Sequence, residues 1–112
     1  DMFDCILPTA LAKQGVAFTS IGRRDLRRAA YRDNEGPLDP ACACYTCSTY
    51  SIAYLFHLLK VHETQGWQLL GLHNIHFYMQ LMAGLRRSIE QGELQAFARG
   101  FLARQQSQAS VP

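Results

Sequence analysis

The chain has 112 residues, of which 48% are hydrophobic and 18% are charged, a balance typical of one modest globular domain and not of a disordered segment. The formal net charge of +2 gives only a mild preference for polyanionic partners. No apolar run of about 18 residues and no signal peptide are visible, so we expect neither a membrane span nor secretion. Because the first residue is Asp1 and not methionine, we expect a piece of a longer polypeptide.

The N-terminal part is predicted to begin as a short extended segment, Met2–Leu7, which Pro8 stops, followed by a loop over residues 8–15. Taken alone, the carboxylates of Asp1 and Asp4 fit a cap and a turn. The end of a strand is also where α/β barrels place their reacting groups. Both interpretations of these carboxylates stay open at this point.

A short β-prone stretch, Val16–Thr19, and a turn over residues 20–22 predict one half of a hairpin. The basic run from Arg23 to Arg32 that follows is either an amphipathic helix with a solvated face or the return strand of the hairpin. Arginines at this density with an interleaved tyrosine also suit contact with an RNA backbone. The five arginines are Arg23, Arg24, Arg27, Arg28 and Arg32.

Three thiols lie within six residues, at Cys42, Cys44 and Cys47, on a stretch that follows turn signals and is expected to be a loop. With His73 they make a complete tetrahedral ligand set for Zn²⁺, of the closed kind typical of structural sites. A Cys-x-Cys spacing is too tight for an ordinary mutual disulfide. The clustered thiols therefore favour a metal in a reducing cytosol, and the alternative is three unrelated buried or oxidised cysteines.

Ser51 is predicted to cap a helix that runs to about Gln65, where Gly66 stops it. Residues 67–72 are interpreted as a short apolar link. Two histidines inside the helix are interpreted as ordinary surface or partly buried side chains, namely His57 and His62.

The longest helix is predicted to open at His73, with Asn74 as its N-cap and a stop at residues 91–92. A zinc ion on His73 would then pin the start of this helix to the cysteine loop. A last helix is predicted over residues 94–102, and the polar tail 105–112 is expected to fray.

Short motifs follow one another along nearly the whole chain: Asp1-Met2-Phe3-Asp4-Cys5, Leu7-Pro8-Thr9, Pro37-Leu38-Asp39-Pro40, Cys42-x-Cys44-x2-Cys47, Ala53-Tyr54-Leu55, His73-Asn74, Leu81-Met82-Ala83-Gly84-Leu85-Arg86 and Ile89-Glu90-x-Gly92. In this order and spacing they resemble bacterial tRNA-guanine transglycosylase (queuine tRNA-ribosyltransferase). Each motif alone is weak, whereas the series is highly specific. The resemblance implies that the chain is about the last third of such an enzyme.

The fold class that the resemblance implies is α/β, the C-terminal part of a (β/α)8 TIM barrel with an inserted zinc-binding subdomain. The segment itself is expected to be mostly helical with a small β-hairpin. The implied divisions are residues 1–35 for the nucleophile loop and hairpin, 36–73 for the zinc subdomain, 74–104 for the closing barrel helix and C-terminal helix, and 105–112 for a flexible tail.

The activity that the resemblance implies is the exchange of the wobble guanine of tRNA for a 7-deazaguanine, through a covalent aspartyl–ribose intermediate. By this resemblance Asp4 matches the nucleophilic aspartate of the family's Asp-Met-Phe-Asp motif, and a carboxylate is a competent nucleophile at an anomeric carbon. Cys42, Cys44, Cys47 and His73 match the ligands of one structural zinc ion. Candidate RNA contacts are Lys13, Arg27 and Arg28. The implied partners are the tRNA anticodon loop, the deazaguanine base and a second copy of the enzyme, in the cytoplasm and without a membrane.

The chain departs from the family pattern at three positions. Ala10 replaces a usual arginine that contacts the anticodon loop, and Lys13 is the basic residue that follows it. Ile52 removes another positive charge, whereas Arg28 stands where asparagine is common. Loss of a guanidinium removes bidentate and stacking contacts, which affects tRNA affinity or choice. The second aspartate and the base-recognition residues of the family lie outside this chain, which alone is expected to be inactive.

Two other functions compete with this interpretation. The chain is alternatively a zinc-stabilised tRNA-binding or dimerisation module, or a non-catalytic partner subunit, although Asp4 argues against a partner that has lost the nucleophile. An archaeal-type relative that modifies another tRNA position is less favoured, because such chains continue into further RNA-binding domains.

Overall fold

The computed structural model describes residues 2–106, and these residues are mostly helical with one two-stranded antiparallel sheet. This confirms the predicted composition of the segment. The elements in chain order are α1 (Leu7–Lys13), β1 (Val16–Thr19), β2 (Gly22–Asp25), the 3-10 helix η1 (Ala29–Tyr31), α2 (Tyr45–Thr49), α3 (Ile52–Lys60), α4 (Thr64–Glu90) and α5 (Leu94–Gln106).

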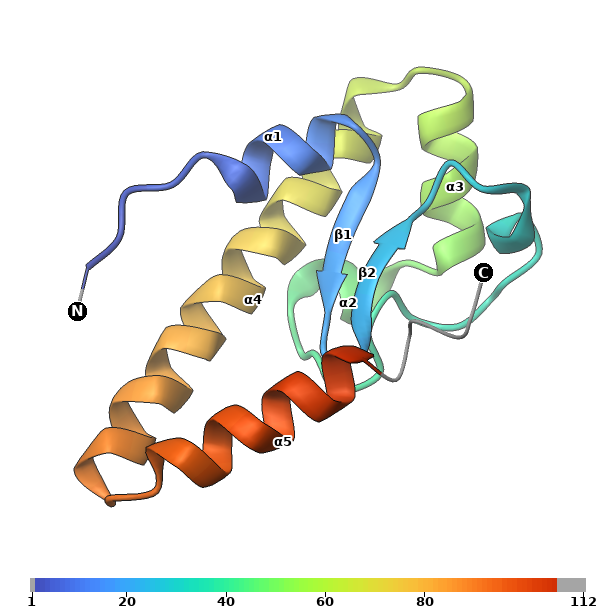
Figure 1. Ribbon diagram of the computed structural model, residues 1–112. Helices are drawn as coiled ribbons and strands as arrows, with labels where there is room; N and C mark the ends of the chain where they lie inside the picture. Colours follow the sequence, from blue (N-terminus) through green and yellow to red (C-terminus); the bar gives the residue numbers. More distant parts are fainter. Residues whose placement is uncertain (1, 107–112) are drawn as a thin grey trace.

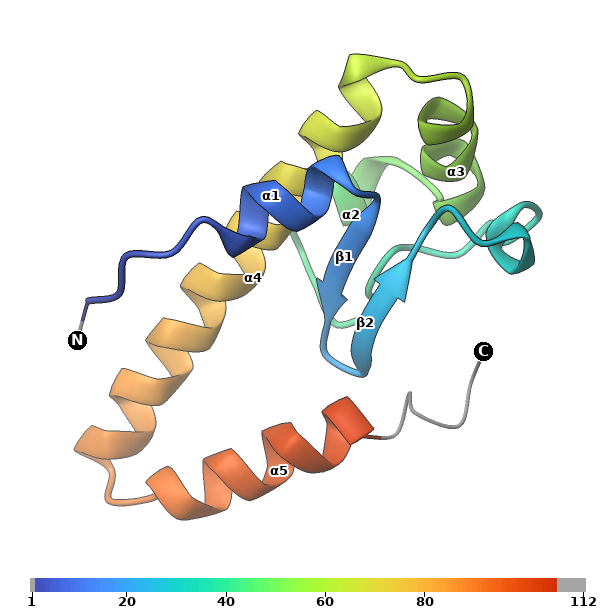
Figure 2. The same ribbon diagram turned by 45° about the horizontal axis from the view of Figure 1, so that its top comes forward.

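The long helix α4 is the element that most of the others contact (Figure 1). Its N-terminal half packs against α1, β1, α2 and α3, and its C-terminal half turns into α5, which also reaches β2. In Figure 2 the hairpin lies between the N-terminal half of α4 and the end of α5. The loop that carries the cysteines passes on the same side of α4 as the hairpin. The N-terminal half of α4 therefore contacts both the hairpin and the cysteine-bearing segment.

The predicted start of the longest helix was wrong. Helix α4 begins at Thr64, so residues 67–72 are helical and His73 and Asn74 lie in its interior. The preceding helix α3 ends at Lys60 and not near Gln65. At Gly66 an added Cβ would lie 3.1 Å from the Cβ of Leu58, so this glycine permits the close approach of α3 and α4 instead of ending a helix.

The ends of the other helices agree better with the sequence. Ser51 caps α3, with its hydroxyl accepting a hydrogen bond from the Tyr54 amide at 3.1 Å. Helix α4 ends at Glu90 with Gln91 as its C-cap, and Gly92 follows with a φ of +70°, the left-handed conformation that glycine adopts at helix ends. Helix α5 confirms the last predicted helix, and it includes Gln105 and Gln106, which were predicted to belong to the frayed tail. Residues 107–112 of the predicted tail, and Asp1, lie outside the described residues.

The predicted loop over residues 8–15 is largely the helix α1. Pro8 stands in its first turn, where the missing N–H is no loss because the first amides of a helix have no intrahelical partner. Ala12 is fully buried, so α1 is held by packing against α4. The segment before α1 is exposed and extends away from the hairpin in Figure 1.

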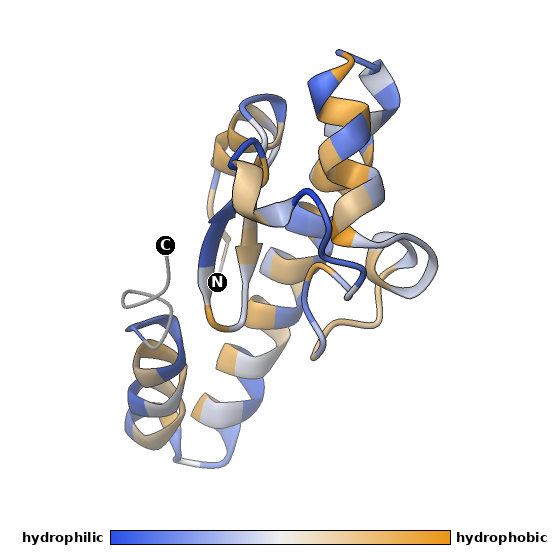
Figure 3. Ribbon diagram, turned by 90° about the vertical axis from the view of Figure 1, so that its right-hand side faces the viewer, coloured by the Kyte–Doolittle hydropathy of each residue, from blue (hydrophilic) through white to orange (hydrophobic). Residues whose placement is uncertain are grey.

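The basic run forms the return strand of the hairpin and not an α-helix. Strand β1 pairs with β2 so that Phe18 faces Arg23 and Val16 faces Asp25. The chain then turns into η1. The guanidinium of Arg23 lies 5.1 Å from the centre of the Phe18 ring. Figure 3 shows the contrast between the hydrophobic β1 and the hydrophilic β2.

The core lies where α1, α3 and α4 meet the hairpin and the cysteine loop. Its members are buried hydrophobic side chains: Ala12, Ala17, Leu26, Tyr31, Leu38, Cys44, Cys47, Ile52, Leu55, Phe56, Leu58, Leu69 and Leu70. One face of α4 and the N-terminal segment leave large hydrophobic side chains exposed, among them Met2, Phe3, Ile6, Leu72, Ile75, Met79 and Ile89. Across residues 2–106, no helix combines the length and apolarity that a membrane crossing requires.

Candidate metal centre

The four predicted metal ligands meet between the cysteine loop and the middle of α4. Cys42 lies in the loop, Cys44 is the N-cap residue of α2, and Cys47 lies within α2. The thiols therefore occupy a loop and the first turns of a short helix, not a loop alone. His73 approaches from the third turn of α4 and is fully buried.

The donor atoms are spaced as the corners of a tetrahedron around a small metal ion. The Nδ1 atom of His73 lies 3.7, 3.4 and 3.3 Å from the sulfurs of Cys42, Cys44 and Cys47, and all four donor atoms lie within 4.8 Å of one another. Tetrahedral Zn²⁺ with Zn–S near 2.3 Å and Zn–N near 2.0–2.1 Å gives a sulfur–nitrogen edge of about 3.6 Å. Three cysteines and one histidine at these distances form a typical structural zinc site.

The ring of His73 is held with the correct nitrogen toward the sulfurs. Its Nε2 lies 2.6 Å from the carbonyl oxygen of Phe18. A carbonyl only accepts, so Nε2 carries the proton and Nδ1 is left with a free lone pair. Hydrogen bonding of the second ring nitrogen is the usual way in which proteins orient a metal-binding histidine.

Burial shifts the ionisation of these groups in the direction expected of a site that needs a cation. Desolvation raises the pKa of the Cys42 and Cys47 thiols above their ordinary value of 9.0. Desolvation also lowers the pKa of His73 below 6.5. Without a metal, burial thus favours the neutral forms of the Cys42 and Cys47 thiols and of the His73 imidazole, whereas a bound divalent cation would hold its sulfur ligands as thiolates.

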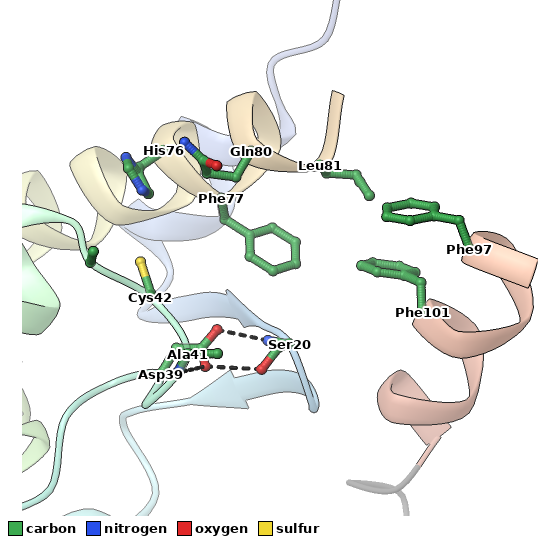
Figure 4. A pocket seen from close by; sticks show the side chains of 11 residues that line it. Ser20, Asp39, Ala41, Cys42, His76, Phe77, Gln80, Leu81, Phe97 and Phe101 are labelled. Atoms are coloured by element: carbon green, nitrogen blue, oxygen red, sulfur yellow. Dashed lines mark hydrogen bonds between the residues drawn. The ribbon is translucent and has the colours of Figure 1, made fainter. Parts of the chain in front are cut away.

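Asp39 fixes the cysteine loop to the hairpin (Figure 4). Its buried carboxylate accepts hydrogen bonds from the Ser20 amide at 2.8 Å, the Ser20 hydroxyl at 2.9 Å and the Ala41 amide at 3.1 Å. Its backbone carbonyl accepts from the Cys42 amide at 3.0 Å. The turn signal of Asp39-Pro40 was visible in the sequence, but its partner 19 residues away was not.

A pocket of about 350 Å³ borders the centre beside Cys42, between α4, α5 and the hairpin turn. Figure 4 shows Phe77, Phe97 and Phe101 grouped on its far side. Cys42, which is only partly buried, is the one predicted metal ligand that lines this pocket.

Asn74, predicted as an N-cap, has a different role. Its side chain accepts from the Phe18 amide at 3.0 Å and donates to the carbonyl oxygens of Pro8 at 3.0 Å and Val16 at 3.1 Å. Asn74 and His73 together form hydrogen bonds with the Phe18 amide, the Phe18 carbonyl and the Val16 carbonyl on the edge of β1 that faces α4. These backbone groups are therefore paired although no further strand lies beside this edge in the described residues. The hydrogen bonds of His73 and Asn74 to Phe18 join residues that are 55 and 56 positions apart. The spacing of apolar residues within one helix could not predict them.

The remaining predicted site residues lie on exposed surface. Asp4 is in the exposed segment before α1 and is not part of the zinc cluster. The Nζ of Lys13 lies 5.2 Å above the Trp67 ring. Arg27 is exposed, with its Nε 3.5 Å from an Asp25 carboxylate oxygen, and Arg28 beside it is also exposed.

The small helical fold closed around a Cys3His cluster defines a zinc-stabilised module. The family model described as "Queuine tRNA-ribosyltransferase" matches residues 1–107, and the chain belongs to this family. Proteins named queuine tRNA-ribosyltransferase from two strains of Acidithiobacillus ferrooxidans are each 50% identical to it over 111 residues, or 99% of the chain. The chain spans 30% of the length of these relatives.

Proposed function

We propose that this chain is the part of a tRNA-guanine transglycosylase that carries the nucleophile and the zinc centre. The observation that carries the proposal is the family match over residues 1–107 in a chain that retains both Asp4 and the complete Cys3His set. The proposed activity, in the cytoplasm, exchanges the wobble guanine of tRNA for a 7-deazaguanine. It belongs to the full-length gene product that contains these residues, since the chain spans 30% of its relatives.

The same family match supports a barrel context for this chain. We propose that residues 1–35 and 74–104 pack onto the remainder of a (β/α)8 barrel and that residues 36–73 form an insertion. Exposed Ile75 and Met79 on α4 support this arrangement, because apolar faces of this kind normally pack against a further layer.

In the proposed reaction, the Asp4 carboxylate attacks the anomeric carbon of the wobble nucleotide, and the bond to the guanine nitrogen breaks with its electron pair. The leaving guanine is protonated, and Asp4 holds the ribose as an ester. The incoming deazaguanine loses a proton and attacks the same carbon, which releases the carboxylate. Two displacements restore the configuration, as in retaining glycosidases. The exposed position of Asp4 supports access by a nucleic acid.

Zinc is proposed to be held by Cys42, Cys44, Cys47 and His73 and to stabilise the fold. All four tetrahedral positions are filled by protein donors, so the site provides no open position for substrate. Its contribution is to join the cysteine loop to α4 and, through the His73 ring, to β1.

Lys13, Arg27 and Arg28 are proposed as contacts to the tRNA backbone. The side chain of Arg27 passes over Gly15, where an added Cβ would lie 3.0 Å from its Cγ, so Arg27 lies next to the end of α1 that carries Lys13. Adjacent exposed cations suit phosphate contact. The other proposed partners are the deazaguanine base and a second copy of the enzyme.

The test is covalent trapping of tRNA on the full-length gene product, followed by denaturing electrophoresis. The parent and an Asp33→Ala control, which removes another exposed carboxylate, are expected to form a shifted protein–tRNA band. Asp4→Ala is expected to form none. A band that persists in Asp4→Ala would refute the nucleophile assignment. Absence of a band in every variant, with tRNA binding retained, would favour the non-catalytic alternative of a zinc-stabilised tRNA-binding module or partner subunit.

A further inference from the structure

We propose that Asn74 is a positioning residue for the Asp4 segment, acting through its hydrogen bonds to α1 and β1. The inference rests on the proposed function, because it concerns the placement of the proposed nucleophile. It adds a residue that contacts neither the zinc donors nor the reacting atoms.

The first observation is that Asn74 joins three pieces of chain at one point. Its amide donates to the Pro8 carbonyl at the start of α1 and to the Val16 carbonyl in β1, while its oxygen accepts from the Phe18 amide. The side chain is fully buried. An asparagine has two N–H donors and one carbonyl acceptor, and each has a backbone partner here.

The second observation is that the segment before α1 has little other support. Met2, Phe3 and Ile6 are 92, 81 and 75% exposed, so no packing among residues 2–106 fixes the direction in which Asp4 leaves α1. The fixed point nearest to Asp4 is the first turn of α1, where Asn74 bonds to Pro8. Rotation or displacement of this turn would move Asp4 directly.

The third observation is that Asn74 follows the predicted zinc ligand His73 directly in the chain and bonds to the same β1 residue. His73 donates to the Phe18 carbonyl and Asn74 accepts from the Phe18 amide, so consecutive residues of α4 hold both backbone groups of one β1 residue. We infer that the metal centre fixes the position of β1 relative to α4 through His73, and that Asn74 fixes α1 relative to both through its bonds to Phe18 and Pro8. Misplacement of a reacting group by about 1 Å costs on the order of 10²-fold in rate.

The test uses Asn74→Asp in the full-length gene product. The aspartate keeps the shape and the acceptor oxygen but replaces the two N–H donors by an oxygen that faces two carbonyls. The matched control is Thr46→Val, which removes a buried hydrogen bond from the same module, Thr46 hydroxyl to Leu69 carbonyl at 2.8 Å, without touching α1 or β1. Zinc content, tRNA affinity and the rate of covalent complex formation are measured for each.

We expect Asn74→Asp to keep its zinc and its tRNA affinity within about twofold and to form the covalent complex roughly 10- to 100-fold more slowly. Thr46→Val is expected to react within about threefold of the parent. Equal rates in Asn74→Asp and Thr46→Val would overturn the inference. Failure of the proposed function looks different, because the parent itself would then form no complex or Asp4→Ala would still form one.

A second variant, Asn74→Ala, covers the case in which the aspartate prevents folding. It removes all three hydrogen bonds without adding an oxygen, and it is expected to slow the reaction similarly with zinc retained. Loss of zinc from both variants would contradict the inference, since Asn74 would then stabilise the metal centre itself.

Discussion

His73 has two functions in the structure, and substitution by glutamine is expected to separate them. The Nδ1 atom faces the three sulfurs, while Nε2 donates to the Phe18 carbonyl. The glutamine amide nitrogen reaches approximately the position of Nε2, so His73→Gln retains a donor for Phe18. It has no atom in the place of Nδ1, so the variant removes one zinc ligand with little change in packing.

The magnitude follows from the four-ligand geometry. Structural zinc sites contribute roughly 10–16 kcal/mol, so one ligand of four accounts for about 3 kcal/mol, or about 10²-fold in zinc affinity. At a free zinc concentration near 1,000 times the parent Kd, the metal stabilises the parent by about 4 kcal/mol and the variant by about 1.4 kcal/mol. The difference of about 2.7 kcal/mol corresponds to a Tm lowered by roughly 10 °C in a domain of this size.

The assay is thermal unfolding at fixed free zinc, together with competition against a chelator of known affinity. His76→Gln is the control, because His76 lies one turn further along α4 and is not a member of the metal cluster. In excess chelator, parent and His73→Gln are expected to unfold within a few degrees of each other. The assignment of Nδ1 as a ligand would be refuted if His73→Gln bound zinc as tightly as the parent, or if its Tm equalled that of the parent at every zinc concentration.

Three further predictions concern pH and stability. In zinc-free protein, burial lowers the pKa of His73 below 6.5 and raises that of Cys47 above 9.0. Stability is therefore expected to fall as the pH drops below about 6.5 and as it rises above about 9, and urea titrations with a flat or inverted profile would contradict this. Leu70→Ala, at a fully buried position, is expected to lower the free energy of unfolding by about 2–5 kcal/mol, whereas Leu72→Ala, 47% exposed, should cost less than about 1 kcal/mol by the same urea measurement. Ser51→Ala removes the α3 cap and is expected to cost about 1 kcal/mol, while Ser51→Asp should restore most of it.

The zinc cluster was predictable because its signal is chemical and partly local. Three thiols within six residues limit the possible functions to metal binding or oxidation, and a histidine completes the set. The first strand of the hairpin, Val16–Thr19, and the Ser51 cap were predictable for similar reasons, since turn residues and caps act over a few positions. The structure brings together Cys42, Cys44, Cys47 and His73 without changing this set.

The course of α4 was not predictable from local signals. Gly66 and Asn74 are ordinary stop and start signals, but here Gly66 provides close packing with Leu58 and Asn74 bonds to Pro8 and β1. Tertiary contacts of this kind override local preference. Their partners lie far away in the sequence, so no window along the chain contains both sides of the contact.

The helix α1 was missed for a related reason. Pro8 was taken as a stop, although proline is equally suited to the first turn of a helix. The buried side of this helix, at Ala12, packs against α4, and only that packing distinguishes a short helix from a loop.

The most direct test of the zinc centre is a pair of mass spectra, native and denaturing, of protein purified under reducing conditions. We expect one zinc ion per chain in the native spectrum, lost on denaturation, and reduced zinc occupancy in a His73→Gln variant measured in parallel. A native mass without metal, combined with a denatured mass lowered by disulfide formation among Cys42, Cys44 and Cys47, would contradict the zinc assignment.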